Sequence, residues 1–180
     1  MPIHSKNFFA FFRLEPKLCL DLESLQKRFD ELSRKSAEEP SEAVEAATIL
    51  NNGYRTLRDP VKRAQYLLAE EGFPIGEQTS KDVPSELLEE VFELNRMLED
   101  LKNGGPRARA QLETAKGHFA SLKQDVDEEL EKLFAKYDVA EAQSETGKQA
   151  LDEIRGVLNR RRYVENLIRD VDRILALAPD

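Results

Sequence analysis

The side chains that most often do chemistry in proteins are few and scattered in this sequence. It has one cysteine, Cys19, and two histidines, His4 and His118. These residues form neither a CxxC nor an HExxH motif, so they predict no metal site. A single cysteine also excludes an intramolecular disulfide, and we interpret Cys19 as a small buried apolar side chain.

Carboxylates are plentiful, but their spacing is that of solvated helix faces. Glu89, Glu90, Glu93 and the run DVDEELE at residues 125–131 have no neighbours that would raise a carboxyl pKa for acid–base catalysis. The sequence also has no P-loop and no GxGxxG motif for nucleotides. We therefore expect a protein that is not an enzyme, needs no cofactor and acts by binding.

One predicted helix, PSELLEEVFELNRMLEDLK at 84–102, carries more apolar surface than a core needs. At about 100° per residue, a single stripe contains Leu87, Val91, Leu94, Leu98 and Leu101. Leu88 and Phe92 lie one turn apart on another face, among charged neighbours. They form a small protein-binding patch, or are buried by a bundle that wraps further round, or are incidental surface residues.

Apolar residues at steps of three and four predict helices in the first half of the chain. They are Leu22, Leu25, Phe29 and Leu32, followed by Ala43, Ala47, Leu50, Tyr54 and Leu57. Asp21 and Asp59 are placed as N-caps, and Gly72 as a left-handed helix stop. Ser36 and Glu39 are spaced as a capping box ahead of the second helix.

The second half begins after PIGEQTSKDVP at 74–84, whose Gly, Pro and polar residues mark a boundary near residue 76. Beyond it we expect three longer helices, from about Pro84 to Lys102, Pro106 to Tyr137 and Ser144 to Leu177. The core stripe of the last helix contains Val157, Val164, Ile168, Val171 and Leu175. Tyr163 flanks that stripe, either as an aromatic anchor for a partner or as a core-edge tyrosine.

We therefore predict an all-α fold. Residues 1–76 form a helical hairpin with a short third helix, and residues 77–180 form a three-helix bundle.

The charge and the hydropathy of the sequence limit the classes of partner that the chain could bind. The net charge is −8, and residues 77–180 hold 16 Lys and Arg against 23 Asp and Glu. The basic run Arg160–Arg162 points in different directions on a helix, so no basic stripe predicts nucleic-acid binding. No apolar run approaches the roughly 20 residues of a membrane span, and the opening lacks signal-peptide features. We expect no membrane contact and a cytoplasmic location.

Three stretches carry a family likeness. They are NFFAFFRLEPKLCLDLESLQKRF (7–29), LNNGYRTLRDPVKRAQYLLAEEGF (50–73) and LLEEVFELN (87–95). These stretches resemble the HscB-type co-chaperones of iron–sulfur cluster biogenesis, over nearly the whole chain and most weakly between Gly104 and Lys148. The resemblance implies an N-terminal J domain and a C-terminal bundle. It also implies that the bundle binds the iron–sulfur scaffold IscU and that the protein presents it to HscA, a DnaK-type chaperone.

The family's scaffold-binding face can be carried over residue by residue. It falls on Leu88, Phe92, Glu93, Arg96 and Tyr163. The resemblance thus selects the same apolar pair that the periodicity places off the core stripe. This chain departs from the family at Glu89, where a large apolar residue is usual, and at Arg96, which replaces a frequent acidic residue.

The family's chaperone-coupling tripeptide, His-Pro-Asp, is missing from the connection between the second and third J-domain helices. The corresponding residues here are Ser36, Ala37, Glu38, Glu39 and Pro40. The basic residues of the chaperone-facing helix, diluted by acidic neighbours, are Lys27, Arg28, Arg34 and Lys35. The resemblance then implies weak or lost ATPase stimulation, and we expect residues 1–76 to keep the J fold without its trigger.

Three functions stay open from the sequence. The chain is a co-chaperone that delivers a scaffold to its chaperone, a J-like adaptor with no chaperone coupling, or a helical interaction protein outside iron–sulfur assembly. Spare apolar surface on a bundle is compatible with a monomer or a weak dimer.

Overall fold

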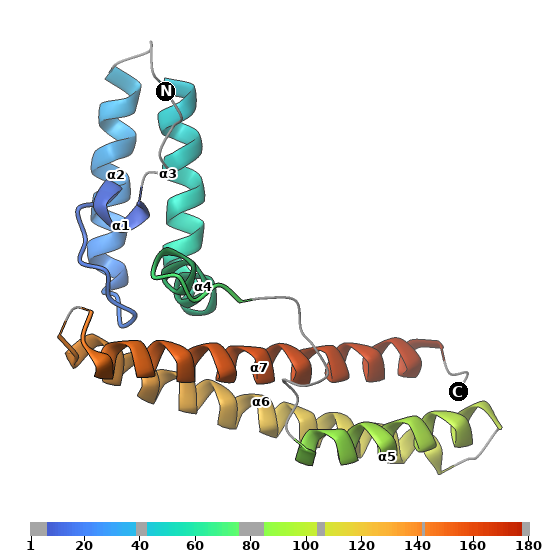
Figure 1. The fold of residues 1–180 in the computed structure, drawn as a ribbon. Coiled ribbons are helices and arrows are strands. Elements are labelled where there is room, and N and C mark those ends of the chain that lie inside the picture. The colour runs from blue at the N-terminus through green and yellow to red at the C-terminus, as the bar shows by residue number, and fades with distance from the viewer. Residues whose placement is uncertain (1–6, 39–42, 76–84, 104–106, 142, 178–180) are drawn as a thin grey trace. The chain divides into compact units, whose positions relative to one another are not determined.

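The computed structural model describes residues 7–38, 43–75, 85–103, 107–141 and 143–177. Within these ranges every regular element is an α-helix (Figure 1). The helices are α1 (Phe8–Phe11), α2 (Leu22–Glu38), α3 (Ala43–Arg58), α4 (Pro60–Glu70), α5 (Ser85–Lys102), α6 (Ala108–Val139) and α7 (Glu145–Leu177). The predicted all-α fold and the order of its long helices are confirmed.

Contacts group the chain into two compact units. The N-terminal unit comprises Met1–Ile75 and Leu133–Asp152, and the C-terminal unit comprises Gly76–Lys132 and Glu153–Asp180. The end of α6 and the start of α7 therefore belong with the N-terminal helices. The predicted domains, residues 1–76 and 77–180, stay a prediction, because contacts do not establish which segments fold alone.

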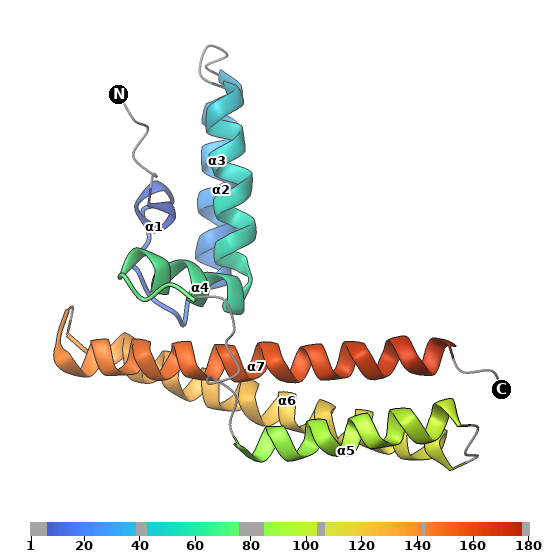
Figure 2. The ribbon, with the colours of Figure 1, turned by 45° about the vertical axis from the view of Figure 1, so that its right-hand side comes forward.

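In the N-terminal unit, α2 and α3 form an antiparallel pair, and α1 and α4 both contact α3 (Figures 1 and 2). The buried apolar residues of these helices and of the connection after α1 are Phe9, Phe12, Leu18, Leu25, Leu50, Leu57, Ala64, Leu67 and Leu68. Helix α1 lies very close to α3 at Gly53, where an added Cβ would stand 2.8 Å from the Phe12 ring. The aromatic opening of the chain is thus part of the core.

The caps predicted from the sequence are present. The Asp21 carboxylate accepts two backbone N–H groups of the first turn of α2, at 3.2 Å each. The Asp59 carboxylate does the same for α4, at 2.9 Å each. Gly72 has φ +82° just after α4, a conformation that glycine adopts without steric cost. These residues fix where the two helices begin and where α4 ends.

Two charged side chains hold the connection between α1 and α2. Arg63 of α4 is buried and donates to the carbonyl oxygens of Leu18 and Leu57, at 2.9 and 2.6 Å. Asp138 of α6 accepts the backbone N–H groups of Leu18 and Cys19, at 2.7 Å each. Both polar groups of the Leu18 backbone therefore have charged partners, which offsets the cost of burying them.

In the C-terminal unit, α5, α6 and α7 share one core, as a three-helix bundle does (Figure 2). The buried cluster contains Leu87, Leu94, Leu112, Phe119, Val164, Leu167 and Val171. Every residue of the stripe predicted on α7 is buried or partly buried. On α5, the side chains of Leu98 and Leu101 lie outside the described residues.

Two predictions about single residues are wrong. Ser36 lies inside α2, which extends to Glu38, so it does not cap the next helix. Cys19 is exposed, because the fold fixes its backbone N–H through Asp138 and leaves its side chain at the surface.

Candidate partner-binding surfaces

Leu88 and Phe92 are exposed on α5, which excludes the alternative that the bundle buries them. Their exposed fractions are 38% and 75%, whereas Leu87 and Leu94 on the same helix are 6% and 4% exposed. The bundle therefore buries Leu87 and Leu94 and leaves this pair in water. Covering a phenylalanine side chain with a partner is worth about 1.5–3 kcal/mol.

The charged neighbours of this pair are exposed as well. Glu89, Glu93 and Arg96 all lie at the surface, and none has an ion pair with another residue in the described part of the chain. Charges at the rim of an interface govern which partner docks, and how fast, more than the final affinity. We call Leu88, Phe92, Glu93 and Arg96 the α5 patch.

Tyr163 of α7 is partly buried against the bundle core. Burial raises the pKa of its phenol, which is the behaviour of a hydroxyl held away from water. Tyr163 therefore lies at the edge of the bundle core. A role for Tyr163 in binding a partner stays a prediction.

The segment that replaces the family's coupling tripeptide is helical where the structure describes it. Ser36, Ala37 and Glu38 are the last three residues of α2, and Glu39 lies outside the described residues. The backbone N–H groups at these positions therefore belong to a helix end. Their part in chaperone coupling stays a prediction.

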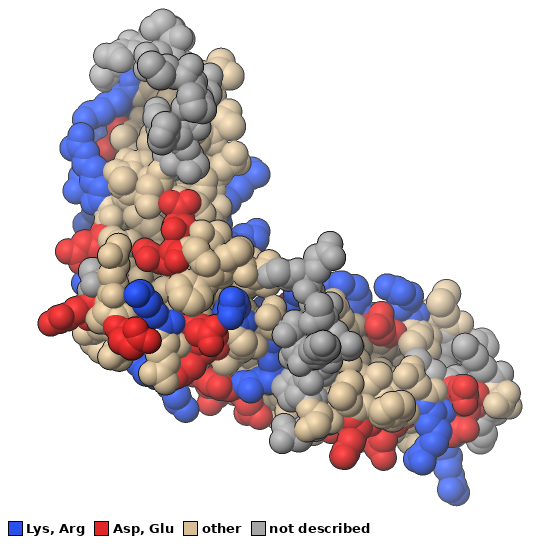
Figure 3. Space-filling view, viewed as in Figure 1, with Lys and Arg blue, Asp and Glu red and all other residues tan. Residues whose placement is uncertain are grey.

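The basic residues of α2 follow one edge of the N-terminal unit, where Lys and Arg side chains gather (Figure 3). Arg28 is paired with Glu31, with Nη1 and Oε2 3.0 Å apart. Lys27, Arg34 and Lys35 are exposed and have no ion pair within the described ranges. Three cations are thus available to an acidic partner, and one is engaged within the helix.

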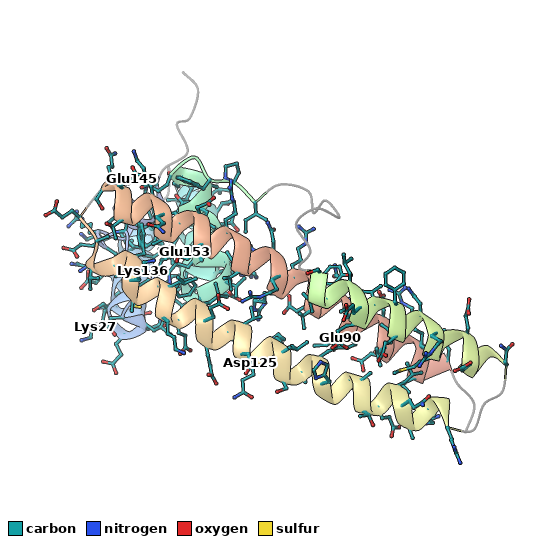
Figure 4. The ribbon with its side chains drawn as sticks, turned by 60° about the horizontal axis from the view of Figure 1, so that its bottom comes forward. Lys27, Glu90, Asp125, Lys136, Glu145 and Glu153 are labelled. Atoms are coloured by element: carbon teal, nitrogen blue, oxygen red, sulfur yellow. The ribbon has the colours of Figure 1, made fainter. Side chains whose placement is uncertain are left out.

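A small hollow of about 300 Å³ lies in the C-terminal unit. Glu90 of α5 and Asp125 of α6 are among its lining residues (Figure 4). Across it, Oε1 of Glu90 and Nε2 of His118 are 2.9 Å apart, which ties α5 to α6. Among the described residues, no three His, Cys, Asp or Glu side chains are placed to hold a metal ion. No helix in the described ranges combines the length and apolarity needed to traverse a membrane.

A larger cavity, of about 460 Å³, lies in the N-terminal unit and has no signal in the sequence. Its lining comes from the connection after α1, the residues after α4, and the turn between α6 and α7. These segments lie up to 136 positions apart, from Glu15 to Leu151. Helical periodicity describes one segment at a time, so it gives no signal for a site assembled from three.

The chain is similar to known proteins in sequence and in fold. No family model matches the sequence. A co-chaperone protein HscB homolog of Vibrio vulnificus is 32% identical over 139 residues, covering 68% of this chain and 81% of that protein. A homolog of the same name from Neisseria meningitidis is 29% identical over 171 residues, covering 85% of this chain and 97% of that protein.

Two solved structures share the fold. The human co-chaperone protein HscB has a TM-score of 0.65 at 19% identity and covers 96% of this chain and 82% of its own. The chaperone HscB from Vibrio cholerae has a TM-score of 0.57 at 20% identity and covers 95% of this chain and 98% of its own. At 19–20% identity the two solved structures show the fold alone. The family is shown by the sequence relative that is 32% identical.

Proposed function

The chain belongs to the HscB family of co-chaperones, and from this premise we propose that it binds an IscU-type iron–sulfur scaffold protein through the α5 patch. The observation that carries the proposal is the exposure of Phe92, at 75%, on a helix whose Leu87 and Leu94 are buried. A large aromatic side chain kept in water is the usual centre of a protein interface. On this proposal the protein is a binding partner and not an enzyme.

The proposed role includes presenting the scaffold to a DnaK-type chaperone of the HscA kind. Lys27, Arg34 and Lys35 on α2 supply an exposed basic edge for an acidic chaperone surface. The His-Pro-Asp tripeptide is absent from the sequence, and Ser36–Glu38 are the end of a helix. We propose that chaperone binding is weak and that ATPase stimulation is weak or lost. The predicted cytoplasmic location stays a prediction.

A second candidate is favoured by the same altered segment. An adaptor that holds the scaffold without engaging any chaperone needs the α5 patch and does not need the coupling tripeptide. Single-turnover ATP hydrolysis by the DnaK-type chaperone, with the scaffold present, separates the two functions. Stimulation by the added protein supports the co-chaperone, and an unchanged rate together with scaffold binding supports the adaptor.

Scaffold binding is tested by calorimetric titration of the IscU-type protein into the full chain and its variants. Phe92→Ala is expected to weaken binding by about tenfold or more, since hot-spot aromatics contribute about 2 kcal/mol or more. The matched control is Val139→Ala, which truncates another apolar side chain, 85% exposed and outside α5. Equal affinities of the two variants would contradict the proposal.

A further inference from the structure

The cavity of about 460 Å³ in the N-terminal unit has walls that the fold holds in place. One wall is the connection after α1, where Asp138 and Arg63 fix the backbone of Leu18 through charged hydrogen bonds. Another is the end of α6, where Asp138 itself lies. A site whose walls are fixed before a ligand arrives loses little entropy on binding, and this volume is in the range of small-molecule sites.

The lining combines an apolar floor with aromatic rings. Phe73, Tyr137 and Leu151 contribute to it. Leu151 is only 3% exposed, and the two aromatic residues are partly buried. Aromatic faces of this kind attract organic cations and cover their methylene groups. Strongly hydrated metal ions gain nothing from such a floor.

The charges of the lining are mostly negative. Its charged residues are Glu15, Lys17, Glu71, Asp138, Glu141 and Lys148. Glu15 is paired with Lys17, with 2.8 Å between Oε2 and Nζ, and both carboxylate oxygens of Asp138 accept backbone N–H groups. Glu71 and Glu141 have no ion pair within the described residues. They are therefore free to bind a cation.

Two further observations agree with a cation and disfavour an anion. The pKa of Tyr137 is raised, chiefly by burial and also by the negative charges of Glu71 and Asp138. The adjacent start of α7 is capped, because Ser144 Oγ accepts the N–H of Gly147 at 3.1 Å. That amide is not available to an anionic ligand. Among the described lining residues, Lys148 is the cation that has no ion pair.

We propose that this cavity binds a small aliphatic polyamine. One ammonium group pairs with Glu71 or Glu141, and the methylene chain lies over Phe73 and Tyr137. Lys148 lowers the affinity by repelling the ligand. The site is separate from the α5 patch, so the proposal does not depend on scaffold binding.

The test is calorimetric titration of spermidine into the full chain at fixed ionic strength. We expect saturable binding at one site, and binding at least about tenfold weaker in the double variant Glu71→Gln, Glu141→Gln, since each lost charged hydrogen bond costs more than a tenfold change requires. The matched control is Glu131→Gln, an exposed carboxylate outside the cavity, which is expected to bind as tightly as the wild type. Ammonium chloride and magnesium chloride are expected to show no saturable binding.

A second variant is expected to change the affinity for spermidine in the opposite direction. Lys148→Ala removes the rim cation, and we expect it to bind spermidine more tightly. Weaker binding by Lys148→Ala would mean that the site prefers anions and would overturn the proposal. No saturable binding of spermidine, or equal weakening in the double variant and in Glu131→Gln, would also overturn it, because diffuse attraction to a chain of charge −8 acts on all carboxylates alike.

Discussion

Asp138 accepts the backbone N–H of Leu18 in a hydrogen bond of 2.7 Å, although 120 positions separate the two residues. The same carboxylate accepts the N–H of Cys19, so each of its oxygens serves one amide. From the other side, Arg63 donates to the Leu18 carbonyl. The segment Leu18–Cys19 thus links α4 and α6. We expect its hydrogen bonds to Asp138 and Arg63 to contribute to the stability of the fold.

Asp138→Ala is expected to lower the free energy of unfolding by about 2–4 kcal/mol, because two amides lose a charged acceptor and one of them belongs to a buried residue. Urea denaturation followed by circular dichroism measures the change. The control is Asp125→Ala on the same helix, whose carboxylate is exposed and has no ion pair in the described residues. If both variants unfold at the same urea concentration, the bonds of Asp138 add nothing to stability.

The two faces of α5 predict opposite results for stability. Leu94→Ala should cost about 2–5 kcal/mol, because it leaves a cavity in the bundle core. Phe92→Ala should change stability by less than about 0.5 kcal/mol, because the side chain is 75% exposed. Thermal melts of the two variants make the comparison. A large loss for Phe92→Ala would show that this residue packs in solution and is not a free binding surface.

Substitution of two glycines on different helices is expected to change the free energy of unfolding in opposite directions. Gly53→Ala puts a Cβ 2.8 Å from the ring of Phe12, which is fully buried, so we expect a loss of about 1–3 kcal/mol in the free energy of unfolding. Gly117→Ala on α6 meets no atom within 4 Å and should gain about 0.5–1 kcal/mol from helix propensity. Chemical denaturation of both variants checks the signs. A gain for Gly53→Ala would mean that α1 does not pack against α3.

The environment of Asp127 predicts that the stability of the fold depends on pH. Burial by itself would raise its pKa, but hydrogen bonds from Arg161 and Lys123 outweigh burial and hold the pKa below the ordinary value of 3.8. Folding therefore favours the ionised form. The contribution is complete at neutral pH and is lost as the pH falls below the unfolded pKa toward the lower folded one. Because the group is partly exposed, the contribution is about 1 kcal/mol or less.

The corresponding variant is Asp127→Asn. Its stability should be below that of the wild type at about pH 7, and the difference should shrink as the pH falls below the unfolded pKa toward the lower folded one, because the wild-type carboxyl then becomes protonated as well. Urea denaturation at a series of pH values measures this difference. A difference that stays constant with pH would mean that the side chain acts by packing and not by charge.

Most of the helical structure could be predicted from the sequence, because helix starts and stops are local. Asp21, Asp59 and Gly72 act within a few residues of their own positions, and the off-stripe placement of Phe92 follows from helical geometry alone. Asp138 gave no such signal, since nothing near it in the sequence indicates that its partners are Leu18 and Cys19. The exposure of Cys19 was missed for the same reason.

Of the two candidate sites, one could be predicted from the sequence and the other could not. The α5 patch lies on one helix, so periodicity and the family likeness both select it. The polyamine cavity draws Glu71 and Glu141 from segments that the fold alone brings together. Side chains at a site of that kind look like ordinary solvated charges until the tertiary structure is known.

The separation of Leu18 from Asp138 also bears on how the chain is made. A ribosome adds about 5–20 residues per second, so on the order of ten seconds passes between the synthesis of Leu18 and that of its acceptor. During this interval the amides of Leu18 and Cys19 lack the acceptor that Asp138 provides in the folded chain, and the first helices are made before the segment that completes their unit. A segment that is made late, Leu133–Asp152, therefore completes the unit that residues 1–75 begin.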